Sequence, residues 1–269
     1  MKNTKTLGIA ICAATILAVP FRILDNTIAS VLFKKGNFFG GICETLGSVL
    51  PFFICAFCFA ALIFCRHTRT TRTKNKILSV LLGVATFLAS AAAVYTSVYR
   101  SSSKNYYAVF GAAAVITAVF ICLGATLFKT NYQKTLMTKH SAIGIITSVA
   151  SIAIYFLCKL VPMRPSYAAL QDSFEKFGNY DNPEAFVPFL ALSGIGAAMT
   201  IWFKCFSEIF PKLKFSRKYL VIASFLITAV ILFGSVSSGN TYGSEYIYGA
   251  VATYVVFLIT SIIVEKREK

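Results

Sequence analysis

Long, nearly uninterrupted apolar segments are the feature of this sequence that most restricts its fold. Each continues for about 18 to 23 residues without alternating with polar side chains, which is the length and pattern of a helix that crosses a bilayer. A chain that is 57% hydrophobic and 13% charged could not bury so much apolar surface in a soluble domain. We count eight segments: Leu7–Leu24, Cys43–Cys65, Ile77–Tyr99, Tyr106–Phe128, Ala142–Pro162, Ala185–Phe206, Tyr219–Val236 and Tyr246–Val264. The sequence therefore predicts an all-α, polytopic transmembrane helix bundle of about eight spans, in which residues 1–269 form a single integral membrane domain.

The charged residues are distributed unevenly between the connections. The chain has 26 Lys and Arg against 10 Asp and Glu, and most of the basic residues fall at the two termini and after the second, fourth and sixth segments. Cytoplasmic connections are enriched in Lys and Arg, so this pattern predicts a multi-pass protein of the cell membrane with both termini in the cytoplasm. The basic connections are explained as topology signals that favour anionic lipid headgroups. We therefore expect membrane lipids as partners and no nucleic acid, and the composition is compatible with a bacterial inner membrane.

The first segment and the cysteines each have an alternative interpretation. The start, MKNTKTLGIA, resembles a signal peptide, but no small-x-small cleavage site follows, so we predict an uncleaved anchor. The sequence CAFC at 55–58 has the spacing of a metal or redox pair, yet it lies inside an apolar segment and has no second pair of ligands. We interpret these cysteines as small hydrophobic residues and predict neither a metal nor a cofactor.

Polar residues gather in two connections that the topology places on the outer side. These are VPMRPSYAALQDSFEKFGNYDNPEAF (161–186) and SVSSGNTYGSEY (235–246), which lie at the ends of four consecutive segments. Lys159 and Arg164 precede or begin the longer one, and a compact ammonium beside a planar guanidinium suits a phosphate group. The alternative is that both side chains reach to the interface and only end the span. Pro162 and Pro165 are expected to stop the helix there.

Three motifs in these regions resemble those of the type-2 phosphatidic acid phosphatase family. The sequence KLVPMRP (159–165) is similar to the first motif, a lysine followed by an Arg-Pro pair, although the two cations are two residues closer here. LSGIGAA (192–198) corresponds to the second motif, PSGH, and GSVSSGNTYGSEYIYGA (234–250) to the third. The segment from LDNTIASVLF to FFGGICETLGSVLP also looks like the amino-terminal region of bacterial members.

The resemblance implies a lipid-phosphatase-like helical core at 142–264, preceded by amino-terminal helices at 1–130. It assigns phosphate binding to Lys159, Arg164, Ser193 and Gly194. Enzymes of the family use one histidine as nucleophile and a second as general acid, but Ile195 and Thr241 occupy those positions here, and Glu245 replaces the orienting aspartate. The two histidines of the chain, His67 and His140, both fall in connections assigned to the cytoplasm. We therefore expect a protein that binds a phosphate headgroup, such as that of a lipid phosphate, on its outer face and is catalytically impaired.

Two other functions remain open from the sequence. The first is an active phosphatase with a substituted nucleophile, for example Thr241 acting with Glu245. The second is a transporter or flippase-like permease, which the prolines inside two segments, Pro51 and Pro188, would suit. Against the permease, the sequence shows no inverted repeat and few polar residues in the middle of its apolar segments. The sequence gives no indication of the oligomeric state.

Overall fold

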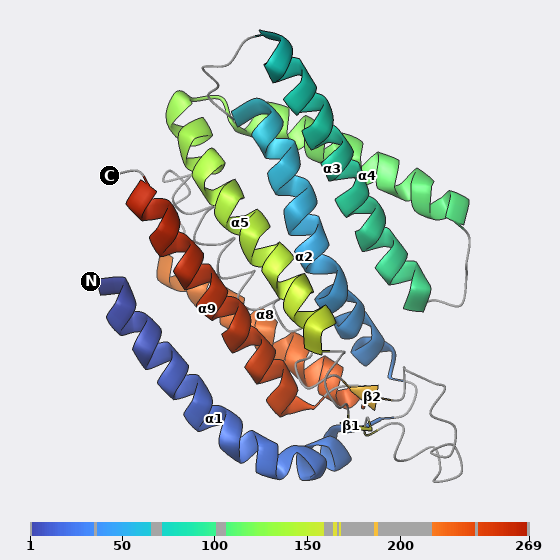
Figure 1. Cartoon of the computed structure of the whole chain (residues 1–269). Helices are drawn as coiled ribbons and strands as arrows, with labels where there is room; N and C mark the ends of the chain where they lie inside the picture. Colours follow the sequence, from blue (N-terminus) through green and yellow to red (C-terminus); the bar gives the residue numbers. More distant parts are fainter. Residues whose placement is uncertain are drawn as a thin grey trace.

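A computed structural model describes residues 2–34, 37–65, 72–100, 106–158, 164–165, 167, 186–187, 217–239 and 242–267. These residues form long helices (Figure 1) and one short pair of strands. The helices are α1 (Lys2–Leu32), α2 (Phe38–Cys65), α3 (Arg72–Arg100), α4 (Tyr106–Leu127), α5 (Asn131–Cys158), α8 (Arg217–Ser237) and α9 (Gly243–Arg267). The strands are β1 (Arg164–Pro165) and β2 (Phe186–Val187). Apart from this strand pair, the elements of the described residues are all helices, which confirms the prediction of a helical bundle for this part of the chain.

Three of the described helices are long and apolar enough to cross a membrane. They are Phe38–Cys65, Thr73–Val98 and Tyr106–Leu127, and they coincide with the second, third and fourth predicted spans. Large apolar side chains on the last two face outward, as for Leu81 and Leu88 on α3 and Val115 on α4, each more than half exposed. Such surfaces suit a lipid environment better than water. The protein is therefore a membrane protein.

α2 is the central helix of the bundle. It contacts α3 and α4 on one side and α5 and α8 on the other, while α9 lies between α5 and α1 (Figure 1). The largest apolar cluster joins α2, α5 and α9 through Phe57, Cys65, Met137, Ile143 and Phe257, all of them buried. The start of α1 and the end of α9 lie at the same end of the bundle, and the strands lie at the opposite end (Figure 1).

The strand pair corrects one predicted boundary. The sixth span was expected to begin at Ala185, but Phe186 and Val187 are extended and pair in antiparallel fashion with Pro165 and Arg164. The physical reason is that Arg164 and Val187 each precede a proline, and this position disfavours the helical conformation. The remainder of that span, up to Phe206, lies outside the described residues.

Candidate functional site

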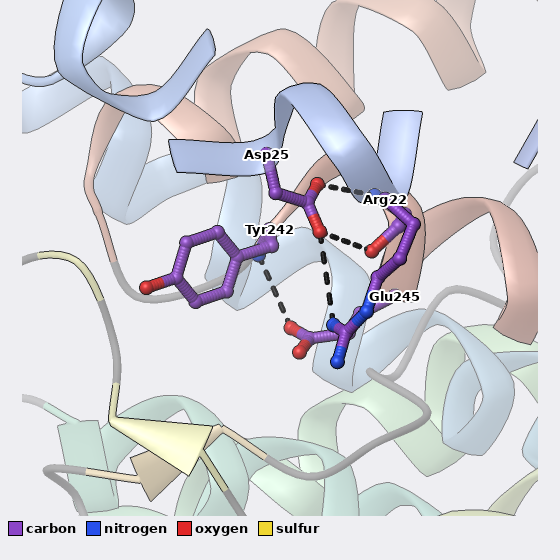
Figure 2. Close-up of polar contacts among 5 residues, drawn as sticks. Arg22, Asp25, Tyr242 and Glu245 are labelled. Atoms are coloured by element: carbon purple, nitrogen blue, oxygen red, sulfur yellow. Dashed lines mark hydrogen bonds and ion pairs between the residues drawn. The ribbon is translucent and has the colours of Figure 1, made fainter. Parts of the chain in front are cut away.

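A cluster of buried polar residues lies where α1 meets the first turn of α9 (Figure 2). Asp25 of α1 accepts hydrogen bonds from the backbone nitrogen of Ser244, at 3.0 Å, and from the Ser244 hydroxyl. Arg22, one turn earlier on α1, places its guanidinium 3.8 Å from the Asp25 carboxylate. Asp25 is 3% exposed and Ser244 is fully buried. This carboxylate therefore ties two helices together inside the protein.

Glu245 completes the start of α9 from within the same helix. Its Oε2 accepts a hydrogen bond from the backbone nitrogen of Tyr242, at 3.2 Å, and its side chain is 1% exposed. The first N–H groups of a helix have no intrahelical acceptor, and a glutamate at the third position commonly supplies one in a capping box. Two carboxylates at this end also interact favourably with the helix dipole. Glu245 thus has a structural contact that accounts for its burial.

Glycines allow the neighbouring chain segments to approach this junction. A side chain added at Gly243 would lie 3.0 Å from the ring of Phe21 on α1. Gly239, just after the end of α8, has a φ of 76°, which is the left-handed conformation typical of a helix C-terminus. A larger residue at Gly243 would therefore press against α1, and one at Gly239 would strain the end of α8.

Tyr167, three residues after Arg164, packs against the same junction. Tyr167 lies in a small apolar cluster with Ala29 of α1 and the buried Tyr242. Its ring also meets that of Phe33 edge-on, with the centroids 5.4 Å apart. The two connections that the sequence placed on one face, 161–186 and 235–246, therefore touch each other through Tyr167 and Tyr242.

The connection between α1 and α2 is bound to this end as well. The backbone nitrogen of Lys34 donates to the Ser237 carbonyl at 3.0 Å, and the Asn37 side chain donates to the Ser237 hydroxyl at 2.8 Å. The ends of α1, α2, α8 and α9 are thus joined by hydrogen bonds near the strand pair. This end of the bundle is the candidate site, which we call the strand end.

The residues predicted from the motifs are only partly placed. The backbone of Arg164 is in β1, and Glu245 is in the first turn of α9. Lys159, Ser193, Gly194, Ile195 and Thr241 lie outside the described residues, as does His67. His140 is described, and it is a buried residue of α5. It precedes Cys158 by five helical turns, so roughly 27 Å of helix separates it from the strand end at a rise of about 1.5 Å per residue.

Sequence reasoning did not single out Asp25 and Ser244. Their contact joins positions 219 residues apart, and neither local spacing nor charge pattern announces it. The only signal in the sequence is that two opposite charges, Arg22 and Asp25, lie three residues apart at the end of the first predicted segment. No family model, curated protein or solved structure matches this chain.

Proposed function

We propose that this protein is a membrane protein of about eight spans with a lipid-phosphatase-like architecture, which binds the phosphate headgroup of a lipid at the strand end without hydrolysing it. In this proposal Lys159 and Arg164 supply the positive charge, and Ser193 and Gly194 contribute hydrogen-bond donors. Both chain termini then lie in the cytoplasm, and the strand end lies on the outer side.

The observation that carries the binding part is the packing of Tyr167, three residues after Arg164. Tyr167 contacts Ala29 and Tyr242, and Arg164 itself pairs with Val187. A cation whose backbone is held by a strand pair and by a packed aromatic ring three residues later has less backbone freedom to lose when it binds an anion. This favours a built binding position over a side chain that only ends a span.

The position of His140 supports the absence of hydrolysis. A phosphohistidine mechanism needs a nucleophilic imidazole within reach of the phosphate. His140 is buried roughly 27 Å along α5 from the strand end. Glu245, which would have to assist a substituted nucleophile such as Thr241, already accepts the Tyr242 N–H.

The test measures binding and phosphate release together. Full-length protein in nanodiscs is offered phosphatidic acid, with phosphatidylcholine and free inorganic phosphate as the comparison ligands. Lys159→Ala and Arg164→Ala are compared with Lys74→Ala, a charge change on α3. Binding of phosphatidic acid that both site variants lose, with no release above background, supports the proposal. Release that both site variants abolish would identify an active phosphatase, and binding unchanged in both variants would contradict the assignment of the cations.

A permease-like function is the second candidate, and buried hydroxyls favour it. The sequence suggested few polar groups within the apolar helices, but Thr147 and Ser148 on α5 and Thr260 and Ser261 on α9 are all buried. Polar side chains facing the interior of a bundle mark many transport pathways, although small hydroxyls also serve helix packing. Stabilisation against heat by soluble solutes, and not by lipid phosphates, would favour this function.

A further inference from the structure

Lys34, in the connection from α1 to α2, is an exposed cation whose backbone is fixed. Its backbone nitrogen donates to the Ser237 carbonyl at the end of α8, at 3.0 Å, and its own carbonyl accepts the Asn37 N–H at 3.1 Å. The residue itself is exposed, and its ammonium group has no hydrogen-bond or ion-pair partner among the residues that the structure describes. The main chain therefore holds Lys34 in place while its charge is available to a ligand.

Aromatic packing connects the Lys34 position to the segment that contains Arg164. Phe33, the residue before Lys34, contacts the ring of Tyr167 edge-on, with the centroids 5.4 Å apart. Tyr167 follows Arg164 by three residues, and β1 holds the Arg164 backbone against Val187. Both the end of α1 and β1 lie at the strand end (Figure 1). Lys34 is thus a further cation of this end, and a phosphate group is bound best by several charged donors.

An exposed apolar strip of α2 begins one turn after this lysine. Phe38, Ile42 and Leu46 are 82%, 41% and 50% exposed, and residues four apart lie on one face of a helix. A side chain added at Gly41, beside the strip, would meet nothing within 4 Å, whereas Val49, one turn beyond it, is buried. These three residues, which we call the apolar strip, cover roughly 12 Å of helix at a rise of about 1.5 Å per residue.

We propose that the lipid of the proposed headgroup site lies along the start of α2, with Lys34 on its phosphate and one acyl chain on the apolar strip. This inference rests on the proposed function and adds a cation and a chain position to it. Lys34 directly precedes the apolar helix that begins at Phe38, so the two contact points are ordered as phosphate and chain are ordered in a bilayer. A third cation beside Lys159 and Arg164 favours a phosphomonoester, which carries up to two negative charges at neutral pH.

The start of α3 has the same order of residues without a connection to the strand end. Lys76 is exposed and is followed by Ile77 and Leu81, which are 57% and 58% exposed. α3 begins beyond the other end of α2 (Figure 1). Any cation before an apolar face attracts anionic lipids to some extent. The start of α3 therefore shows how much lipid preference this order of residues produces by itself.

Photocrosslinking of the full-length protein in nanodiscs tests the proposal. Two probes carry the same diazirine-labelled acyl chain, one on phosphatidic acid and one on phosphatidylcholine, and mass spectrometry identifies the labelled residues. We expect the phosphatidic acid probe to label the apolar strip several fold more than the phosphatidylcholine probe, and both to label Leu81 about equally. Lys34→Ala should remove this preference and Lys34→Arg should keep most of it. Only main-chain atoms of Lys34 bond to the bundle, so these variants retain its contacts.

Lys76→Ala is the matched control and should leave the preference at the apolar strip unchanged. Equal labelling of the strip by the two probes would overturn the proposal. A preference that persists in Lys34→Ala would overturn it too, because the lysine would then only complement the C-terminal end of α1.

Lys159→Ala and Arg164→Ala, measured in parallel, separate this inference from the proposed function. Loss of the preference in these two variants and in Lys34→Ala supports both. Loss in these two but not in Lys34→Ala would retain the headgroup site and overturn the position of the lipid on α2. Loss in Lys34→Ala alone would support the lipid position on α2 and contradict the assignment of the phosphate to Lys159 and Arg164.

Discussion

Asp25 accepts two hydrogen bonds from Ser244, one from the backbone nitrogen and one from the hydroxyl, and so connects α1 to the first turn of α9. The carboxylate acts as the N-terminal acceptor of a helix that begins 218 residues later in the chain than Asp25 itself, a role that a neighbouring residue usually performs. Both residues are buried, so water cannot offer either of them another hydrogen-bond partner.

Removal of this contact should destabilise the protein. Asp25→Ala leaves a buried N–H and a buried hydroxyl without their acceptor, and we expect a loss of about 1–3 kcal/mol in the free energy of unfolding. Asp25→Asn keeps one acceptor oxygen and should lose less. The measurement is unfolding in detergent, followed by the near-ultraviolet circular dichroism of the folded state.

A double-mutant cycle separates the contact from general disruption. If Asp25 acts through Ser244, the loss in Asp25→Ala/Ser244→Ala will be smaller than the sum of the two single losses. Arg22→Gln serves as the control, because an ion pair to a half-exposed guanidinium contributes only about 0–1 kcal/mol. Strictly additive losses in the cycle would show that the two residues do not stabilise one another.

Glu245 should behave as a capping residue. Glu245→Ala removes the acceptor of the Tyr242 N–H, and we expect a loss of about 1 kcal/mol in the free energy of unfolding. Glu245→Gln retains a carbonyl oxygen at the same place and should recover most of this loss. Equal losses in both variants would indicate that the negative charge, and not the hydrogen bond, is what the protein requires.

The close approach of α2 and α8 depends on Gly234. A side chain at this position would overlap the sulfur of Cys43, which is itself 2% exposed. We expect Gly234→Ala to destabilise the protein by about 1–3 kcal/mol because the two helices must move apart. The measurement is again unfolding in detergent.

Two further variants test whether crowding is the cause. Gly83→Ala on α3, where an added side chain meets nothing within 4 Å, should be neutral or slightly stabilising. Cys43→Ala combined with Gly234→Ala should regain part of the loss, since it removes the sulfur that is struck. No recovery in the double variant would place the conflict at the Cys43 Cβ, which alanine retains and which lies 2.7 Å from the added carbon.

The sequence predicted the helices far better than it predicted the contacts at the strand end. Apolar segments marked α2, α3 and α4 because their length and composition are dictated by the bilayer. α1 extends from Lys2 to Leu32, beyond the predicted Leu7–Leu24, because hydropathy marks only the apolar part of a helix and not the polar turns on either side of it. The structure describes α5 as far as Cys158; Pro162, which was expected to stop this helix, lies outside the described residues.

The contact between Asp25 and Ser244 could not be predicted in the same way. Asp25 is one of 10 acidic residues in the chain, and its charge alone does not select a partner. The selection comes from the packing of α1 along α9 and from the close fit of Gly243 against Phe21, both of which are tertiary features. The motifs led to the hypothesis of phosphate binding. In the structure, Glu245 of the third motif accepts a hydrogen bond from the Tyr242 N–H and so caps α9.

Tyr167 should hold the connection between α5 and β2 against the bundle. Its ring packs against Phe33, Ala29 and Tyr242, and truncation to alanine removes these apolar contacts. We expect Tyr167→Ala to make the connection from 166 to 185 more susceptible to protease by several fold, because local opening no longer has to break this packing. The measurement is limited proteolysis of protein in nanodiscs, with cleavage sites identified by mass spectrometry. Tyr107→Ala is the matched control, since that tyrosine is 91% exposed; it should leave the cleavage rate unchanged. Equal cleavage of wild type and Tyr167→Ala would mean that the aromatic contact does not hold this connection, and it would then have no part in forming the proposed headgroup site.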